Sequence, residues 1–402
     1  MEVLPGTANR VGRRRLPDLR EPRLALLVAS LTEAFFLFML MGYGPLYLHS
    51  HWHAPFLLAS EGAALPSLAT FAGSIAWGYL IRPLGLRRVA ITGLAGYVLL
   101  GAAIWSVSTP VAYVAVVSAL TLLSSALAPA TLAYLIPSGG GVGARLAQRL
   151  QWQSGGWMTA GLAGGYLYGL GPRSFPFTML VLGLLAGLAL VGVARSRAAG
   201  ASVPPWGLGH RARIPYGALW LVVILPFFLA YAGNEGFFTN FGLYLHTLDI
   251  PPVWVGWTAA ISTALGWMLA ARAGRLADRV GGQRLLLAVL TGYGVTYGLM
   301  ALSPWHAVSV ALFSLPLYPL LTLGAQRAAA ERVHGSAHGA VMGLLNGTSG
   351  LATFVGGTLL GGVETRLGPH WAPWGAAALV GLALALLLAA RVAIKEAPAV
   401  GS

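Results

Sequence analysis

Residues 89–144 read VAITGLAGYVLLGAAIWSVSTPVAYVAVVSALTLLSSALAPATLAYLIPSGGGVGA, a stretch that contains no Asp, Glu, Lys or Arg. A helix needs about 20 apolar residues to cross the hydrocarbon of a bilayer. The stretch is therefore long enough for two membrane spans. Residues 285–326 form a second charge-free stretch of the same kind. Together the two stretches predict an all-α membrane protein.

The composition of the whole chain agrees with this prediction. Of its 402 residues, 57% are hydrophobic and only 9% are charged, whereas about a quarter of the residues in soluble domains are charged. Charged loops and Pro, Gly or Ser turns divide the hydrophobic sequence into twelve predicted spans. They lie at residues 24–48, 56–80, 89–107, 111–136, 150–171, 174–194, 215–247, 253–272, 285–303, 306–326, 339–363 and 371–391.

The basic residues indicate how the chain is oriented in the membrane. The net charge is +14, and all 25 Lys and Arg residues except Arg173 and Arg366 fall on one side of the predicted spans. Loops rich in Lys and Arg face the cytoplasm, which predicts a multi-pass protein of the cytoplasmic (inner) membrane with both termini cytoplasmic. We interpret the Arg-rich residues 1–23 as a cytoplasmic segment that contacts anionic lipid head groups, not as a signal peptide or a nucleic-acid-binding surface.

An internal repeat divides the chain into two halves. The sequence Leu46-Tyr47-Leu48-His49 at the end of span 1 recurs as Leu243-Tyr244-Leu245-His246 at the end of span 7. The glycines of span 5 at 155, 164, 165 and 169 likewise recur in span 11 at 347, 356, 357 and 361. Six spans per half are typical of a parallel repeat about an axis normal to the membrane. The predicted parts are residues 1–23, a bundle at 24–194, a cytoplasmic linker at 195–213, a bundle at 214–391 and a tail at 392–402.

A charged, glycine-containing loop occurs in both halves. Between spans 8 and 9 the chain reads Gly274-Arg275-Leu276-Ala277-Asp278-Arg279-Val280-Gly281-Gly282-Gln283-Arg284. This loop resembles the signature G-x-L-A-D-R-x-G-R-R of the major facilitator superfamily, and the resemblance covers essentially the whole chain. It implies a bacterial transporter, similar to drug or sugar exporters, built from two six-helix bundles.

The same resemblance implies a gate at these loops. The first-half copy, residues 78–88, keeps Gly78, Gly85 and Arg88 but has Arg82 where the family has its aspartate. In the second half, Asp278 would dock on the start of span 5 near Arg145 and Arg149, because a carboxylate can accept hydrogen bonds from a helix N-terminus. The alternative is that Asp278 is a solvated charge of an inside loop. The expected gating residues are Gly274, Asp278, Arg279, Gly281, Arg284, Gly78, Arg82, Gly85 and Arg88.

Few acidic residues fall within the predicted spans. Glu33 lies in span 1, Glu235 in span 7 and Glu61 near the outer end of span 2. A lone carboxyl in hydrocarbon takes up a proton or pairs with a cation, so Glu33 and Glu235 are candidate proton carriers or counter-ions. The alternative is that each is a protonated packing residue. No Lys or Arg falls within a span by these boundaries, which argues against an anionic substrate.

Polar and aromatic residues of the other cavity-lining spans complete the predicted site. The resemblance places spans 1, 4, 7 and 10 around the cavity, and the two glycines of residues 231–236 suggest a locally loosened helix. Aromatic rings can stack on sugars, planar molecules or cations. The predicted substrate- and proton-binding residues are Glu33, Glu235, Asn234, Tyr43, Tyr47, Asn240, Gln151, Trp157 and Tyr318.

Span 5 carries Gly156, Gly165 and Gly169, which resemble the glycine signature of the family's drug/proton antiporters. Leu170 departs from that signature, which has a proline after the last glycine. Glycines on one face let two helices approach closely. We therefore expect these glycines to pack against those of span 11, namely Gly347, Gly356 and Gly357.

The predicted function is secondary transport by alternating access, with export of a small neutral or cationic organic solute in exchange for protons as the favoured form. Uptake of a sugar, nucleoside or similar nutrient with protons is the alternative. A polytopic membrane enzyme is disfavoured because no G-x-S-x-G or H-E-x-x-H motif occurs. The cluster of His49, His51 and His53 has no carboxylate nearby in sequence, so no metal site is predicted. No cofactor is expected, and the protein is predicted to be a monomer.

Overall fold

The computed structural model describes residues 22–135, 142–171, 173–195, 216–303, 305–332 and 337–396, and all regular elements within these ranges are helices. The first half contains α1 (Pro22–Phe38), η1 (Met39–Tyr43), α2 (Gly44–Trp52), α3 (Phe56–Leu84), α4 (Leu86–Ser106), α5 (Pro110–Ser124), α6 (Leu127–Leu135), α7 (Val142–Gly169) and α8 (Ser174–Arg195). The second half contains α9 (Tyr216–Leu219), η2 (Trp220–Ile224), α10 (Leu225–Thr247), α11 (Val253–Val280), α12 (Gly282–Leu302), α13 (His306–Phe313), α14 (Leu317–Ala330), α15 (Ala337–Leu367), η3 (Pro369–Trp371) and α16 (Ala372–Glu396).

The predicted all-α fold is confirmed, and each of the twelve predicted spans coincides with a helix or a run of consecutive helices. Nine of the described helical segments are long and apolar enough to cross a membrane, and the bent helix α11 would make a tenth. The helices α7 and α15 are not among these ten. Both contain many glycine and polar residues.

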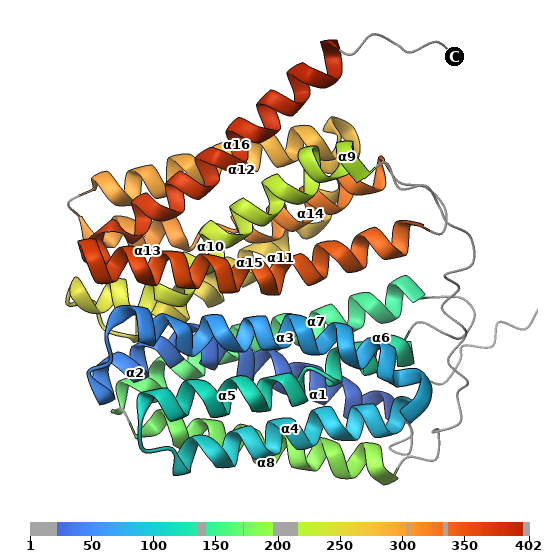
Figure 1. Ribbon diagram of the computed structural model, residues 1–402, viewed down its shortest axis with the longest axis vertical. Coiled ribbons are helices and arrows are strands. Elements are labelled where there is room, and N and C mark those ends of the chain that lie inside the picture. The colour runs from blue at the N-terminus through green and yellow to red at the C-terminus, as the bar shows by residue number, and fades with distance from the viewer. Residues whose placement is uncertain are drawn as a thin grey trace, which may run out of the picture.

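The two halves form two bundles that lie side by side (Figure 1). Helices α1 to α8 make up one bundle, and α9 to α16 make up the other. We call one end of the molecule the histidine end, which carries His49, His51, His53, His246 and His370. We call the other the arginine end, which carries Arg87, Arg88, Arg195, Arg275, Arg279, Arg284 and Arg332.

The seam between the halves has the symmetry that the repeat requires. Helix α3 packs against α15, and α7 packs against α11. Because α7 corresponds to α15 and α11 to α3 in the repeat, these two contacts are copies of each other. Glycines allow the close approach: a Cβ on Gly256 of α11 would overlap the carbonyl group of Gly161 in α7.

The expected pairing of glycines between spans 5 and 11 is wrong. Within α7, Gly156 packs on Leu31 of α1 and Gly165 packs on Val253 of α11. None of the described residues lies within 4 Å of a Cβ built on Gly169. A pseudo-two-fold axis pairs each span with the copy of a different span, so spans 5 and 11 face different partners.

The glycines of α15 divide between two neighbours. Gly356 lies so close to Ala232 of α10 that a Cβ would overlap its carbonyl, and Gly347 and Gly357 face Phe71 and Ala64 of α3. These glycines thus join α15 both to its own half and to the other half.

Polar contacts join the halves toward the histidine end. The Ser60 hydroxyl donates to Oδ1 of the Asn240 side chain at 2.5 Å, and the Thr358 hydroxyl donates to Oε1 of Glu61 at 2.7 Å. Closer to the histidine end, the rings of His49 and His246 lie 6.0 Å apart between centroids. These histidines are the last residues of the two copies of the Leu-Tyr-Leu-His repeat, and the two copies therefore meet each other across the seam.

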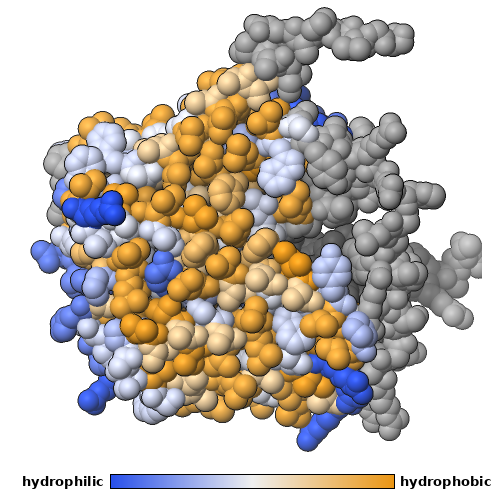
Figure 2. All heavy atoms as spheres, in the orientation of Figure 1, coloured by the Kyte–Doolittle hydropathy of each residue, from blue (hydrophilic) through white to orange (hydrophobic). Residues whose placement is uncertain are grey.

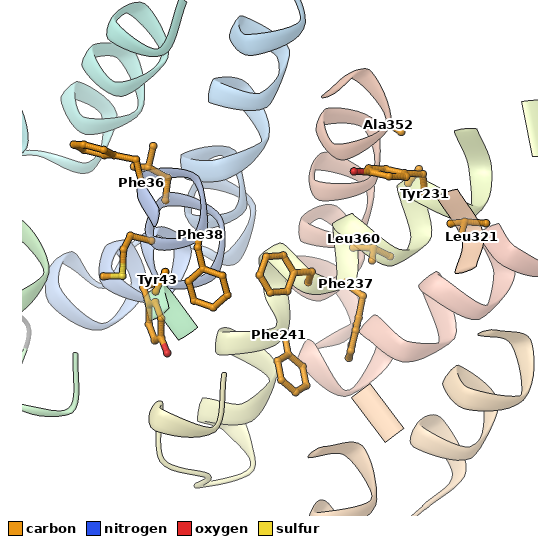
Figure 3. Packing of buried hydrophobic residues seen from close by; sticks show 14 of the residues in the cluster. Phe36, Phe38, Tyr43, Tyr231, Phe237, Phe241, Leu321, Ala352 and Leu360 are labelled. Carbon is orange, nitrogen blue, oxygen red and sulfur yellow. The ribbon is translucent and has the colours of Figure 1, made fainter. Parts of the chain in front are cut away.

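An aromatic layer crosses the seam at mid-depth. Phe38 of α1 lies 5.8 Å from Phe238 of α10 between ring centroids, and Trp157 of α7 contacts both. Figure 3 shows Phe38 pointing toward the helix that carries Phe237 and Phe241. This aromatic layer, made of Phe38, Trp157 and Phe238, lies on the histidine-end side of Glu33 and Glu235, because both α1 and α10 run toward that end.

The outer surface is apolar. Large hydrophobic side chains such as Leu188, Leu299 and Leu302 are exposed on the helices, and apolar residues cover most of the visible face of the bundles in Figure 2. A soluble monomer rarely exposes so large an apolar surface, whereas a lipid-facing surface is expected to be apolar.

Candidate functional site

Glu33 is not the isolated carboxyl that the sequence suggested. It is buried in α1, and its Oε2 lies 3.4 Å from Nη2 of Arg149, which is also buried. The prediction that no Lys or Arg lies within a span is therefore wrong. Helix α7 begins at Val142, about two turns before the predicted start of span 5 at residue 150, so Arg149 lies inside the bundle rather than in a loop.

The Glu33–Arg149 pair has further polar neighbours. The amide of Gln153 hydrogen-bonds to Glu33, and Tyr97 of α4 lies close enough to sense its charge. Arg149 and Gln153 are four residues apart and thus share one face of α7. Gln151, which the sequence analysis selected, lies on another face and is exposed. The carboxylate is consequently neutralised within its own half.

Glu235 has a different environment. It is buried in α10, and its only hydrogen bond among the described residues comes from the Asn234 amide at 3.1 Å. Four tyrosines lie near enough to sense its charge, and none of the described Lys or Arg residues pairs with it. We call the four tyrosines the tyrosine cluster; they are Tyr231, Tyr293, Tyr297 and Tyr318.

Hydrogen bonds order the tyrosine cluster around Glu235. The Tyr297 hydroxyl donates to Oδ1 of the Asn234 side chain at 3.2 Å, and the hydroxyls of Tyr231 and Tyr318 lie 2.9 Å apart. Tyr231 comes from α10, Tyr293 and Tyr297 from α12, and Tyr318 from α14, so three helices contribute. The arrangement can hold a proton or an organic cation against a carboxylate, with tyrosine rings and hydroxyls nearby.

The helix around Glu235 is regular, contrary to expectation. Residues 231–236 lie within the continuous helix α10, and the π-helical turn of this span is η2, nearer the arginine end. The glycines that suggested loosening serve packing instead. Gly233 lies against Ala376 of α16, and Gly236 lies against Gly356 of α15.

The remaining predicted lining residues lie at the seam or in the core. Tyr43 donates a hydrogen bond across the seam to the Pro252 carbonyl at 3.4 Å. Asn240 bonds Ser60 across the seam, and Trp157 belongs to the aromatic layer. Tyr47 stacks on Phe175 inside the first bundle, at 4.7 Å between centroids, and is separate from Glu235.

The two copies of the charged loop have the same backbone. Gly281 has φ 83° and ψ 151°, and Gly85 has φ 82° and ψ 148°. Only glycine adopts this conformation readily, so the loop turns at equivalent glycines in both halves. In the part of the chain that the structure describes, nothing lies within 4 Å of a Cβ built on Gly78 or Gly274, and Arg88, Arg279 and Arg284 are exposed. The side chain of Arg82 lies outside the described residues.

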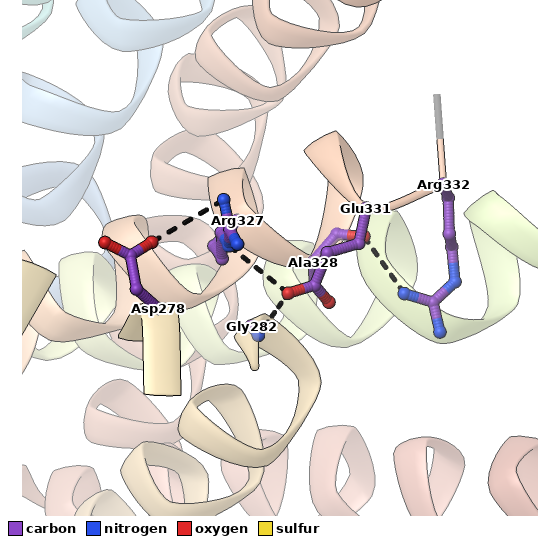
Figure 4. Close-up of polar contacts among 6 residues, drawn as sticks. All are labelled: Asp278, Gly282, Arg327, Ala328, Glu331 and Arg332. Carbon is purple, nitrogen blue, oxygen red and sulfur yellow. Dashed lines mark hydrogen bonds and ion pairs between the residues drawn. The ribbon is translucent and has the colours of Figure 1, made fainter. Parts of the chain in front are cut away.

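Asp278 pairs within its own half. Its carboxylate lies 3.6 Å from Nη1 of Arg327 on α14, and its side chain is 69% exposed (Figure 4). Arg327 also pairs with Glu331, which accepts a hydrogen bond at 2.9 Å from the Gly282 amide at the start of α12. Sequence analysis missed Glu331, although it follows Arg327 by one helical turn. Docking of Asp278 on α7 stays a prediction for a conformation in which the arginine end is closed.

The sequence profile of the Major Facilitator Superfamily matches residues 26–357 and 227–401. The chain belongs to the major facilitator superfamily. It is therefore a membrane transporter of that superfamily. No curated protein matches the sequence significantly.

Solved structures share the superfamily fold. The nucleoside transporter NupG is 14% identical, with a TM-score of 0.74 and coverage of 94% of this chain and 100% of that chain. The peptide transporter POT in complex with sulfate is 15% identical, with a TM-score of 0.73 and coverage of 93% and 94%. A bacterial homologue of the iron transporter ferroportin in an inward-facing state is 15% identical, with a TM-score of 0.67 and coverage of 92% and 98%. At these identities the similarity shows the fold alone.

Replacing Asp278 by Asn is expected to slow transport without changing substrate affinity. In this conformation Asp278 makes only an exposed ion pair, which contributes little stability. The predicted gate contact, in which Asp278 docks on the start of α7, would form when the arginine end is closed. We expect turnover to fall by about fivefold or more, because coupling energies between sites are typically at least about 1 kcal/mol, which corresponds to about fivefold. Transport and equilibrium binding would be measured on the same preparation. Unchanged turnover would argue against the gate, and Glu331→Gln serves as a control that should lower stability instead.

Proposed function

We propose that this superfamily member exports a small neutral or cationic organic molecule across the cytoplasmic membrane in exchange for protons. The single observation that supports this most is the environment of Glu235. It is a buried carboxyl within a cluster of tyrosines, with no partner cation among the described residues. Glu33, by contrast, is already neutralised by Arg149. Glu235 is therefore the proposed site for the proton and for a cationic substrate.

The proposed substrate charge takes Arg149 into account. A buried cation could attract an anionic substrate, but Arg149 is already paired with Glu33, and the pair is neutral as a whole. An anion would have to displace Glu33 before it could bind there. A cation or a neutral molecule can bind Glu235 and the tyrosine cluster without breaking an ion pair.

The contacts along the seam support alternating access. The aromatic layer and the hydrogen bonds of Ser60, Thr358 and Tyr43 join the halves on the histidine-end side of both glutamates. In Figure 1, α3 and α15 run close together near α2 and diverge toward the arginine end. With the arginine end cytoplasmic, as the charge distribution predicts, this conformation is closed to the outside. The other conformation would break these contacts.

Transport in inverted membrane vesicles tests this proposal. The vesicle interior corresponds to the outside of the cell, so an acidic interior should drive accumulation of cationic dyes in the vesicles. A protonophore should abolish this accumulation, and vesicles without the protein should show none. Accumulation of sugars or nucleosides by right-side-out vesicles in acidic medium, without export of cations, would instead support proton-coupled uptake and contradict export.

A further inference from the structure

Glu364 is a buried carboxyl that neither the sequence analysis nor the proposed transport site uses. It lies in α15 near the histidine end, and only 1% of its surface is exposed. Both of its carboxylate oxygens are buried and lack a hydrogen-bond partner among the described residues. Burial of an ionised carboxylate without a partner is far costlier than burial of the neutral acid. The carboxyl is therefore expected to carry a proton in this conformation.

Glu364 lies between two residues of α15, Gly361 and Thr365, that contact the other half of the chain at the seam. One turn earlier, Gly361 packs so closely on Ser60 of α3 that a Cβ would clash with that side chain. The next residue, Thr365, accepts a hydrogen bond from the Leu57 amide of α3 at 2.9 Å. Leu57 and Ser60 belong to the other half of the chain. If the halves separate at the histidine end, these contacts break and water can reach Glu364.

Among the described residues, no charged neighbour stabilises an ionised Glu364. The titratable and charged groups nearest to it along the elements packed on α15 are Glu61 of α3, Tyr244 and His246 of α10, His370 of η3 and Arg366 of α15 itself. Those on the same elements nearer the arginine end are Tyr79 and Arg82 of α3, Tyr231 and Glu235 of α10, Tyr318, Arg327 and Glu331 of α14, His338 of α15 and Arg391, Lys395 and Glu396 of α16. None of those whose side chains the structure describes forms a hydrogen bond or ion pair with Glu364.

We propose that Glu364 is a proton-binding site of the outer gate: the histidine end closes only when this carboxyl is protonated. When the end opens, water solvates the carboxylate and the proton can leave. This inference rests on the alternating access of the proposed function. It assigns the proton a second role there, because a proton from outside would be needed to close the gate after the substrate has left.

The direction of the pH dependence follows from proton counting. The closed conformation binds one proton more than the open one, so low pH favours closure of the histidine end. As the pH rises, the ratio of closed to open molecules falls, by up to about tenfold per pH unit for one proton. A glutamine at 364 is neutral at every pH and should remove this dependence.

Distance measurements between spin labels test the proposal. The natural chain contains no cysteine, so labels can be placed at His51→Cys and Thr247→Cys, two exposed positions at the histidine end of the two halves. In lipid nanodiscs we expect short distances at about pH 5 and a growing population of long distances toward about pH 9. In Glu364→Gln the short distances should persist at all pH values, whereas Glu364→Asp should keep the pH response.

Two controls make each outcome decisive. Glu61→Gln removes a carboxyl of the same seam that is partly exposed in this conformation and whose Oε1 accepts the Thr358 hydrogen bond. A glutamine can accept the same bond, so this variant should keep the wild-type response. Labels at Arg88→Cys and Arg284→Cys should report the opposite movement at the arginine end. A wild-type pH response in Glu364→Gln, or its loss in Glu61→Gln, would overturn the role of Glu364. Distances that change with neither pH nor transported dye would contradict alternating access itself, and this proposal with it.

Discussion

Replacement of Glu235 by Gln is expected to abolish pH-driven transport and to weaken binding of a cationic substrate by about 30-fold or more. Loss of one partner of a buried charge pair costs about 2 kcal/mol or more, and each 1.4 kcal/mol corresponds to about tenfold in affinity. No other carboxylate contacts the tyrosine cluster among the described residues. Glutamine also cannot take up and release a proton, so coupling should be lost as well.

Two measurements on Glu235→Gln separate its possible roles. Equilibrium binding of a cationic dye reports the counter-ion role, and exchange of dye across vesicles without a pH gradient reports movement of the halves. If Glu235 carries only the proton, exchange should persist while gradient-driven accumulation is lost. Glu235→Asp should retain partial activity, and Glu61→Gln should leave dye affinity unchanged. Accumulation at the wild-type level in Glu235→Gln would exclude both roles.

The repeat in the sequence has two counterparts in the structure. The Leu-Tyr-Leu-His copies meet at the seam through His49 and His246, and the equivalent loop glycines Gly85 and Gly281 share one backbone conformation. Both results depend on local sequence repeated at a fixed spacing. The helix partners of the glycines could not be obtained in this way, because a glycine pattern shows that a helix can approach another closely but not which one.

The buried polar residues were predicted less completely, because the ends of the spans were placed inaccurately and because contacts between distant spans cannot be read from local sequence. Arg149 was assigned to a loop because charged residues usually mark the ends of spans, yet α7 continues through it and buries it against Glu33. Glu364 fell just beyond the predicted end of span 11. Tyr293 and Tyr297 share one face of α12, which is a signal that sequence reasoning could have used. Their proximity to Glu235, however, depends on packing between distant spans.

The buried Glu33–Arg149 pair should stabilise the first bundle rather than carry protons. Glu33→Gln leaves Arg149 buried without a counter-ion, and we expect a loss of about 3–5 kcal/mol in stability. Arg149→Gln should be less damaging, since the remaining Glu33 can become neutral by taking up a proton. Thermal unfolding in detergent, followed by the loss of monodisperse protein, would measure both effects.

The double variant Glu33→Gln, Arg149→Gln distinguishes this structural role from a role in coupling. Two amides can hydrogen-bond to each other and leave no buried charge, so much of the stability lost in Glu33→Gln should return. If the pair is structural, the double variant should still transport dye in response to a pH gradient, because Glu235 is intact. Additive loss of stability would show that the two residues do not act as a pair. Recovered stability without pH-driven transport would instead place Glu33 in the proton pathway and contradict its assignment to packing.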